Sequence, residues 1–168
     1  IKNALDAARE AAAAGDLNRA AQIFGMVLQN QADNVEALLG MTKIFLEVGD
    51  TEQAQATLDL LPEAERKGAA YDSAAAALKL LLEAGNLSEA DELDARLAAN
   101  PDDHQTRFDL AVVRNAEGKR VEAAEALVAL MKRDRTWNDD GARKKLLELF
   151  EAWGPKDPAN IKGRRLLS

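Results

Sequence analysis

The chain has 168 residues, a formal net charge of −7 and no cysteine, and 47% of its residues are hydrophobic although only 4% are aromatic. Without cysteine these residues hold no disulfide, no thiolate metal site and no cysteine redox chemistry, and no apolar run approaches the roughly 20 residues that a membrane-spanning helix requires. Alanine and other strong helix formers dominate the composition, which predicts an all-α fold of ordinary domain size.

The charge is distributed unevenly along the chain. Residues 132–168 contain ten basic and six acidic residues, a balance of +4, so residues 1–131 carry −11 of the total. Binding to phosphates requires a basic face that displaces counterions, and the acidic body therefore disfavours nucleic acid as a partner. The basic C-terminal segment either binds an acidic partner or packs on the acidic body of the chain itself.

Four related segments recur along the chain, each built around a glycine: AGDLNRAAQIF from residue 14, VGDTEQAQATL from 48, AGNLSEADELD from 84 and EGKRVEAAEAL from 117. The successive glycines are 34, 36 and 33 residues apart, at Gly15, Gly49, Gly85 and Gly118. Each lies between two helical patterns, where a left-handed glycine ends one helix and lets the next begin. An alanine follows each glycine five residues later, and its small side chain lets antiparallel helices approach closely: Ala20, Ala54, Ala90 and Ala123.

This period, with two helices in each repeat, resembles the tetratricopeptide repeat. The alanine and phenylalanine of that pattern are met by Ala20 and Phe24, and the second and fourth repeats keep the spacing with leucine. The resemblance covers residues 1–134 and implies a right-handed α-solenoid of about four helix pairs with a concave inner surface. Residues 61–68 carry a two-residue excess, and we expect a looser connection there. Helices are expected at residues 2–14, 17–31, 34–48, 51–61, 69–84, 87–99, 103–117 and 120–133.

The resemblance also places candidate partner-binding residues, because the first helix of each pair lines the concave surface in this family. Carried onto this chain, the inward positions are mostly apolar, with a cation in each of the first three repeats: Leu5 and Arg9; Leu39, Lys43 and Leu46; Lys79 and Leu82; Phe108 and Val112. Such a groove is typical of a surface that binds an extended or helical peptide. The lysines have an alternative in surface ion pairs, since Glu47 and Glu83 follow four residues later, and Phe108 has an alternative in packing between repeats.

Residues capable of catalysis or metal binding are few. His104, the only histidine, follows Asp102 and Asp103, and two carboxylates with an imidazole are possible metal ligands. The same acids lie just before a predicted helix, where they stabilise its N-terminus, and this is the interpretation we prefer. The NDDG segment at 138–141 lacks the alternating ligands of a calcium loop, and no phosphate-binding glycine loop is present. We therefore expect no enzyme, no metal and no cofactor in this chain.

Both tryptophans follow the last repeat, in the segment RDRTWNDDGARKKLLELFEAWG at residues 133–154. Asn138 and Asp139 are expected to cap a helix that continues to about residue 153, with apolar residues at spacings of three and four. Because the last repeat of a solenoid exposes an apolar surface, this helix is predicted to cover it. Its packing residues are Trp137, Leu146, Phe150 and Trp153. The predicted domains are residues 1–134 for the repeats and 135–168 for the capping helix and tail.

The last 60 or so residues share further features with one family: FDLA at 108–111, the turn at 118–124, RDR at 133–135 leading to Trp137, the stretch 140–150, Gly154, and RRL at 164–166. They resemble the C-terminal region of the bacterial thioredoxin–tetratricopeptide fusion proteins of the YbbN/CnoX type, also called chaperedoxins. The resemblance implies a thioredoxin-like domain before Ile1, a cytoplasmic location, and a holdase that binds unfolded clients and passes them to the chaperonin or a DnaK-type chaperone. Arg164, Arg165 and Leu166 then become candidates for the chaperonin contact.

The sequence thus leads to two functional hypotheses and a weaker third. The first is a non-enzymatic protein-binding module of a thioredoxin-family chaperone, which binds unfolded clients and partner chaperones. The alternative is a scaffold that recruits one specific peptide or protein through Lys43 and Lys79. An enzyme would need its chemistry in a part of the protein upstream of these residues.

Overall fold

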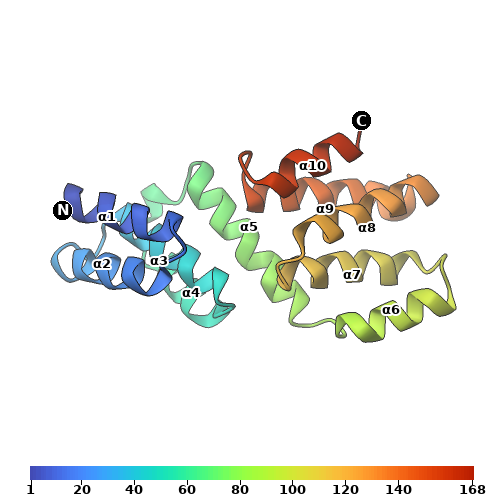
Figure 1. The fold of residues 1–168 in the computed structure, drawn as a ribbon, viewed down its shortest axis with the longest axis horizontal. Coiled ribbons are helices and arrows are strands. Elements are labelled where there is room, and N and C mark those ends of the chain that lie inside the picture. Colours follow the sequence, from blue (N-terminus) through green and yellow to red (C-terminus); the bar gives the residue numbers. More distant parts are fainter. The chain divides into compact units, whose positions relative to one another are not determined.

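The computed structural model describes all 168 residues and contains ten α-helices and one 3-10 helix, with no β-strand (Figure 1). The chain is therefore an all-α protein of the α-solenoid class, as the sequence predicted. It consists of two compact units, Ile1–Leu78 and Lys79–Ser168, and the division between them falls within helix α5.

The first unit is built from two helix pairs and the beginning of α5. The helices are α1 (Lys2–Ala13), α2 (Leu17–Asn30), α3 (Val35–Glu47), α4 (Thr51–Asp59) and α5 (Ala69–Ala84). Gly15 and Gly49 turn the chain between partners with φ of 81° and 79°, a left-handed conformation that a side chain would oppose. Asp16 and Asp50 then cap the following helices, each accepting a hydrogen bond from a backbone N–H three residues later.

Small residues allow the helices of the first unit to pack closely. Ala8, Ala20 and Ala54 are fully buried, as expected where antiparallel helices meet. The ring of Phe24 lies directly on Gly40, where an added Cβ would be 2.4 Å from Phe24 Cζ. The α2–α3 contact therefore depends on the absence of a side chain at Gly40.

The connection between α4 and α5 is longer than the others, but it is not loose. It contains the 3-10 helix Glu63–Glu65. The guanidinium of Arg66 donates to the carbonyl of Leu61 at 3.1 Å and to that of Asp59 at 2.9 Å. These bonds satisfy carbonyls at the end of α4, so the expectation of a loose connection here was wrong.

The second unit contains the end of α5 and five further helices. These are α6 (Ala90–Ala99), α7 (His104–Ala116), α8 (Arg120–Arg133), α9 (Trp137–Trp153) and α10 (Pro158–Leu166). The turn between α7 and α8 contains Gly118 with φ of 82°, like the turns of the first unit. Gly85 does not adopt a left-handed conformation, which corrects the prediction for the third repeat. Backbone bonds from Asn86 to Glu83 and from Leu87 to Ala84 continue past α5, and α6 begins at residue 90 rather than 87.

Two details of α9 differ from the predicted cap. Asn138, Asp139 and Asp140 have φ of 50°, 55° and 60°, so they form a left-handed kink rather than an N-cap, and the right-handed part of α9 begins at Gly141. Asparagine and aspartate tolerate this conformation better than other side-chain-bearing residues. A Cβ on Gly141 would lie 2.9 Å from Asn138 Nδ2, so a larger residue at 141 would have to displace the Asn138 side chain.

The segment predicted as a tail is the helix α10, which makes α9 and α10 a further helix pair. Gly154 has φ of 86°, and buried Ala159 follows it five residues later, repeating the glycine–alanine spacing of the other pairs. Asp157 caps α10 through the N–H of Ala159 at 2.8 Å, and Pro158 occupies its first position.

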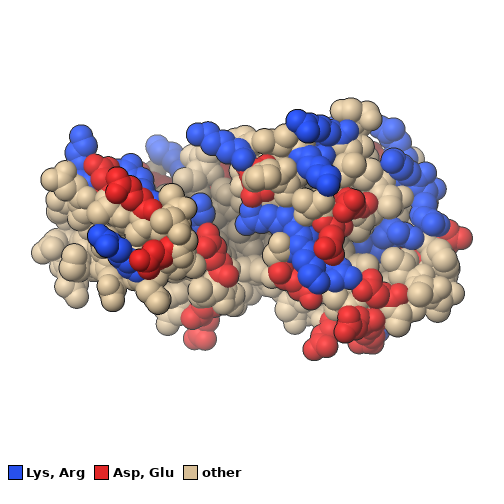
Figure 2. Space-filling model, viewed as in Figure 1, with Lys and Arg blue, Asp and Glu red and all other residues tan.

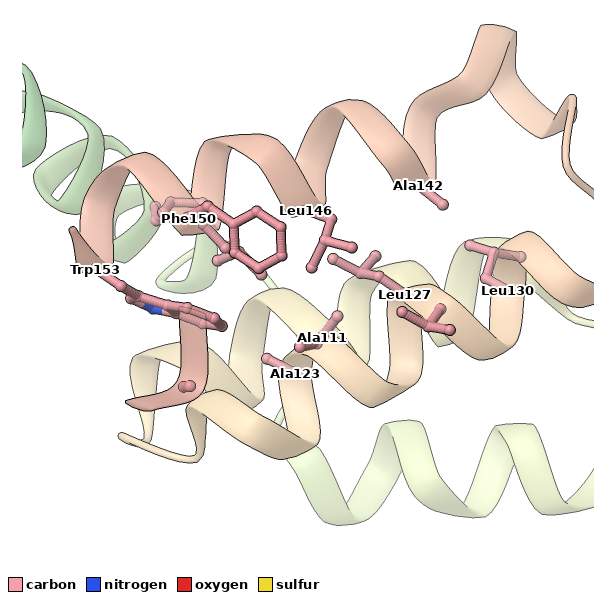
Figure 3. Close-up of a cluster of buried hydrophobic side chains, with 13 residues drawn as sticks. Ala111, Ala123, Leu127, Leu130, Ala142, Leu146, Phe150 and Trp153 are labelled. Atoms are coloured by element: carbon pink, nitrogen blue, oxygen red, sulfur yellow. The ribbon is translucent and has the colours of Figure 1, made fainter. Parts of the chain in front are cut away.

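The main core of the second unit is formed mostly by α8 and α9, which face each other in Figure 3. Leu80 of α5, Ala111 of α7 and Ala159 of α10 also belong to it. Leu146, Leu149 and Phe150 from α9 are almost completely buried there. A smaller cluster, formed by residues of α6 and α7, lies separately: Ala90, Leu93, Leu110 and Val113.

Candidate functional site

In the first unit, three of the predicted partner-binding residues share one face of α3. Leu39, Lys43 and Leu46 are spaced by four and three residues, which places them on one side of the helix. Leu39 and Leu46 are half-buried against the core of this unit, and Lys43 between them is exposed. Lys43 makes no ion pair with Glu47, so the alternative of a surface pair is not realised here. We call these three residues the α3 face.

The neighbouring cation of this unit is neutralised. Arg9 of α1 contacts Asp6 on its own helix, and its Nε lies 3.1 Å from Glu36 Oε1 at the start of α3. Leu5, one turn earlier on α1, is buried. Of the two cations predicted to line the groove in the first unit, Arg9 has acidic partners and Lys43 has none.

In the second unit, four charged residues join α5 to α9. Lys79 Nζ lies 2.8 Å from Glu148 Oε1, and Lys145 Nζ lies 2.8 Å from Glu83 Oε2 and 2.9 Å from Glu148 Oε2. The side chain of Lys145 is only 9% exposed and lies 5.7 Å above the ring centroid of Phe108. We call Lys79, Glu83, Lys145 and Glu148 the α5–α9 charge cluster.

The electrostatics of the charge cluster follow from its hydrogen bonds. Burial pushes the pKa of Glu148 upward, but the hydrogen bonds from Lys79 and Lys145 outweigh that effect, and the pKa lies below its ordinary value. The hydrogen bond to Glu148 and its negative charge raise the pKa of Lys79. Both groups are therefore charged at neutral pH, and Lys145 is buried with two carboxylates that compensate it.

The remaining predicted groove residues of the second unit have different environments. Phe108 packs against Trp137 with ring centroids 5.5 Å apart, so its inter-repeat packing role is realised. Val112 is buried, with 2% of its surface exposed, and does not face solvent. Leu82 is 47% exposed, and Lys79 is exposed although it is paired. The inner face of this unit thus has most of its predicted binding groups engaged within the chain.

The packing residues predicted for α9 lie in or beside the core. Leu146, Phe150 and Trp153 are buried, and Trp137 packs on the edge of the same cluster. Trp153 also donates from Nε1 to Asn115 Oδ1 of α7 at 2.8 Å. Figure 3 shows both Phe150 and Trp153 directed from α9 toward α8.

The three residues predicted for a chaperonin contact lie near the end of α10 in different environments. Arg164 lies over the Phe150 ring at 4.7 Å and donates from Nε to Asn160 Oδ1 at 2.8 Å. Leu166 packs partly on the core, and Arg165 is exposed. Lysine and arginine side chains gather over α10, whereas acidic side chains gather over α6 (Figure 2). Arg164 and Arg165 are thus both exposed, but only Arg164 makes described contacts with other side chains.

Sequence reasoning missed two groups that organise this unit. Asn160 is buried, and its Nδ2 donates to the carbonyls of Phe150 at 3.0 Å and Gly154 at 2.8 Å, which closes the C-terminus of α9. The pair Asp157-Pro158 was the available signal for this helix, since it combines an N-cap with a first-turn proline. The α5–α9 charge cluster had no local signal, because its partners are 62 and 69 residues apart.

His104 and the acids before it act in capping and packing. Asp103 accepts hydrogen bonds from the Thr106 hydroxyl at 2.8 Å and backbone N–H at 3.1 Å, and these bonds lower its pKa. Asp102 pairs with Arg133 at 3.0 Å, and His104 packs edge-on against Trp137. No group of three histidine, aspartate or glutamate side chains is placed to hold a metal ion. None of the helices combines the length and apolar content needed to cross a membrane.

Comparison with known proteins gives matches along most of the chain. Two family models, both described as tetratricopeptide repeat, match residues 11–78 and residues 83–168. The cellulose synthase operon protein C of Xanthomonas axonopodis pv. citri (strain 306) is 30% identical over an alignment of 126 residues, and the match covers 71% of this chain and 8% of that protein. The chain thus spans a small part of the length of this curated relative. A solved domain of a Vibrio parahaemolyticus protein of unknown function matches over 99% of this chain and 97% of that domain, at 25% identity and a TM-score of 0.49.

Proposed function

Because this chain belongs to the tetratricopeptide repeat family, whose repeats are protein-interaction modules, we propose that it binds a polypeptide segment along the α3 face. The observation that supports this proposal is the exposed Lys43, unpaired between half-buried Leu39 and Leu46. An apolar surface with an uncompensated cation suits an extended or helical segment that carries apolar side chains and a carboxylate. No group in the chain is assigned a catalytic role.

We propose that the bound segments belong to unfolded client proteins and that the chain acts beside a thioredoxin-like domain. The support is the resemblance of residues 108–168 to chaperedoxins, together with the apolar character of the α3 face. Under this proposal the exposed Arg165 and the basic surface of α10 contact the partner chaperone. The chain itself supplies no redox chemistry, because it contains no cysteine.

The alternative is a scaffold that recruits one specific partner. The observation in its favour is the similarity to a protein named for a cellulose synthase operon rather than for a chaperone. In this case the carboxylate that meets Lys43 belongs to a defined peptide, and binding is selective for its sequence. Both functions use the same α3 face. They differ in how many kinds of segment bind there, because the chaperone binds many unfolded clients and the scaffold binds one defined peptide.

One pair of variants tests the binding surface, and one pair of assays separates the two functions. Lys43→Glu reverses the unpaired cation, whereas Arg19→Glu makes the same charge change at an exposed position on α2 as a control. We expect wild type and Arg19→Glu to suppress aggregation of a diluted, chemically denatured model enzyme, and Lys43→Glu to lose roughly ten-fold in potency.

Capture from bacterial lysate on the immobilised chain distinguishes the alternative. If the chain is a scaffold, the wild type retains one partner in stoichiometric amount and the Lys43→Glu variant does not retain it. A scaffold also does not suppress aggregation of the denatured model enzyme. If Lys43→Glu and Arg19→Glu behave like wild type in both assays, the α3 face is not the binding surface.

A further inference from the structure

In the second unit, α5 and α9 meet through two crossed ion pairs, in which the side chain of Lys79 is 65% exposed and that of Lys145 only 9%. Lys79 of α5 pairs with Glu148 of α9 at 2.8 Å, and Lys145 of α9 pairs with Glu83 of α5 at the same distance. Along each helix the lysine precedes its glutamate, by four residues in α5 and by three in α9. The two pairs therefore cross as they do between antiparallel helices related by a local two-fold axis.

The apolar contacts repeat this arrangement. Leu80 and Leu146 each follow the lysine of their helix directly, and both are fully buried in the same core cluster. Each helix thus carries a lysine and a glutamate that pair with the other helix, and a leucine that is buried in the shared core. The α9 surface is specific for a helix with this pattern, because reversed charges would place two carboxylates or two ammonium groups together.

The attachment of α5 to α6 is unlike that of the other helix pairs. The turns at 14–16, 48–50 and 117–119 have three residues each and a left-handed glycine, whereas residues 85–89 form a five-residue connection in which Gly85 is not left-handed. The buried residues of α6 pack with α7 and not with α5. The end of α5 is thus joined to this unit by its ion pairs with α9 and by the burial of Leu80 in the main core, all through contacts distant in sequence.

The α9 surface loses stabilising contacts when α5 is absent. If α5 leaves, Lys145 keeps Glu148 but loses Glu83, and Leu80 no longer covers the core, so a nearly buried ammonium group is left partly uncompensated. The same contacts are formed whether α5 comes from the same chain or from another copy. Exchange between copies therefore costs mainly the entropy of association.

We propose that the α9 surface formed by Lys145, Leu146 and Glu148 is a docking site for α5 of a second copy of this chain. Two copies then form a reciprocal dimer in which each α5 lies on the α9 of its partner, with residues 85–89 as the hinge. A short connection holds its ends at an effective concentration of the order of 1 mM, so exchange becomes appreciable as the protein concentration approaches that range. This inference is independent of the α3 face.

Charge reversal tests the exchange directly. One chain carries Lys79→Glu with Glu83→Lys, and a second carries Lys145→Glu with Glu148→Lys. Each chain alone has mismatched charges, both within itself and in a dimer with its own kind. In the mixed dimer, however, the two reversed helices meet each other and the two unchanged helices meet each other. A single chain with all four substitutions restores matching charges internally and serves as the control.

Native mass spectrometry of the mixture gives the readout when one of the two chains is uniformly labelled with 15N, because the paired charge reversals leave the mass of each chain unchanged. We expect the mixed dimer to exceed either homodimer by about ten-fold or more, and the fourfold-substituted chain to remain as monomeric as wild type. A mixture that contains only monomers, while the fourfold-substituted chain melts like wild type, overturns the proposal.

A second measurement keeps the proposal testable if the charge-reversed chains do not fold. The chain has no cysteine, so Lys79→Cys with Glu148→Cys in one chain creates the only two thiols. Treated with a short bismaleimide, this protein is expected to give linked dimers whose fraction rises with concentration. If all linked material remains monomeric up to about 1 mM, the exchange does not occur.

Discussion

Trp153→Ala is the substitution expected to affect the second unit most strongly. The side chain is 9% exposed, lies 6.0 Å from Phe150 between ring centroids, and donates from Nε1 to Asn115 at 2.8 Å. Truncating a buried aromatic residue costs about 3–5 kcal/mol. In a chain of this size each kcal/mol lowers Tm by roughly 2–4 °C, so the Tm of the chain should fall by about 6–20 °C.

Differential scanning calorimetry, with near-ultraviolet circular dichroism as a second probe, measures this change. Trp153→Phe keeps most of the buried ring but loses the hydrogen bond, and we expect it to cost about 1 kcal/mol. Trp137→Ala removes the other tryptophan from a half-buried position and should cost less than Trp153→Ala. If Trp153→Ala melts within about 2 °C of wild type, α9 is not anchored by this side chain and the described core of the second unit is incorrect.

Three further predictions concern the end of the chain and the charge cluster. Gly163→Ala should lower the free energy of unfolding by about 1–3 kcal/mol, because its Cβ would lie 2.6 Å from the Phe150 ring, and an unchanged urea midpoint would contradict the docking of α10. Asn160→Ala should cost about 1–3 kcal/mol by removing the two side-chain hydrogen bonds to the carbonyls of Phe150 and Gly154, each of which keeps only a backbone donor. Hydrogen exchange should then accelerate at the end of α9, and unchanged exchange would refute the role of Asn160. The pKa of Glu148 lies below its ordinary 4.5, so its stabilising effect is present above that value and disappears as pH falls through the folded-state pKa. The stability difference between wild type and Glu148→Gln should therefore shrink below about pH 4, and a difference independent of pH would contradict the pairing with Lys145.

The sequence predicted the regular part of the fold because that part depends on local signals. Glycine followed five residues later by alanine located the α1–α2, α3–α4 and α7–α8 turns, and the helix bounds agree within one or two residues. Capping aspartates and left-handed glycines act within a few residues of their position, so a pattern along the chain is sufficient to find them.

The same signal was misleading at Gly85 and incomplete at Gly154. Gly85 has the expected sequence context, yet its backbone continues the turn of α5, because glycine permits a left-handed conformation without requiring it. Gly154 and Ala159 carry the repeat spacing, but the interval that precedes them contains the left-handed kink at 138–140, which obscured the helix pair.

The candidate sites were less predictable because they depend on contacts distant in sequence. The local sequence suggested an ion pair between Lys79 and Glu83, and the two side chains are 3.8 Å apart. The shorter contact of Lys79, at 2.8 Å, is with Glu148 on α9. Lys145 is the nearly buried centre of the α5–α9 contact, although nothing in its local sequence distinguishes it from its basic neighbours Arg143 and Lys144. On α3, by contrast, helical periodicity was enough to place Leu39, Lys43 and Leu46 on one face.

Site-specific photo-crosslinking tests the central claim that the α3 face binds polypeptide. A benzophenone side chain is introduced at Leu46 on this face, or at Met26, which is 56% exposed on α2, as a matched apolar control. The full chain is then illuminated with the denatured model enzyme and, separately, with any partner captured from lysate. The account predicts linked product from position 46, reduced when Lys43→Glu is added, and little from position 26. Equal linking from both positions, or linking from position 26 alone, would contradict it.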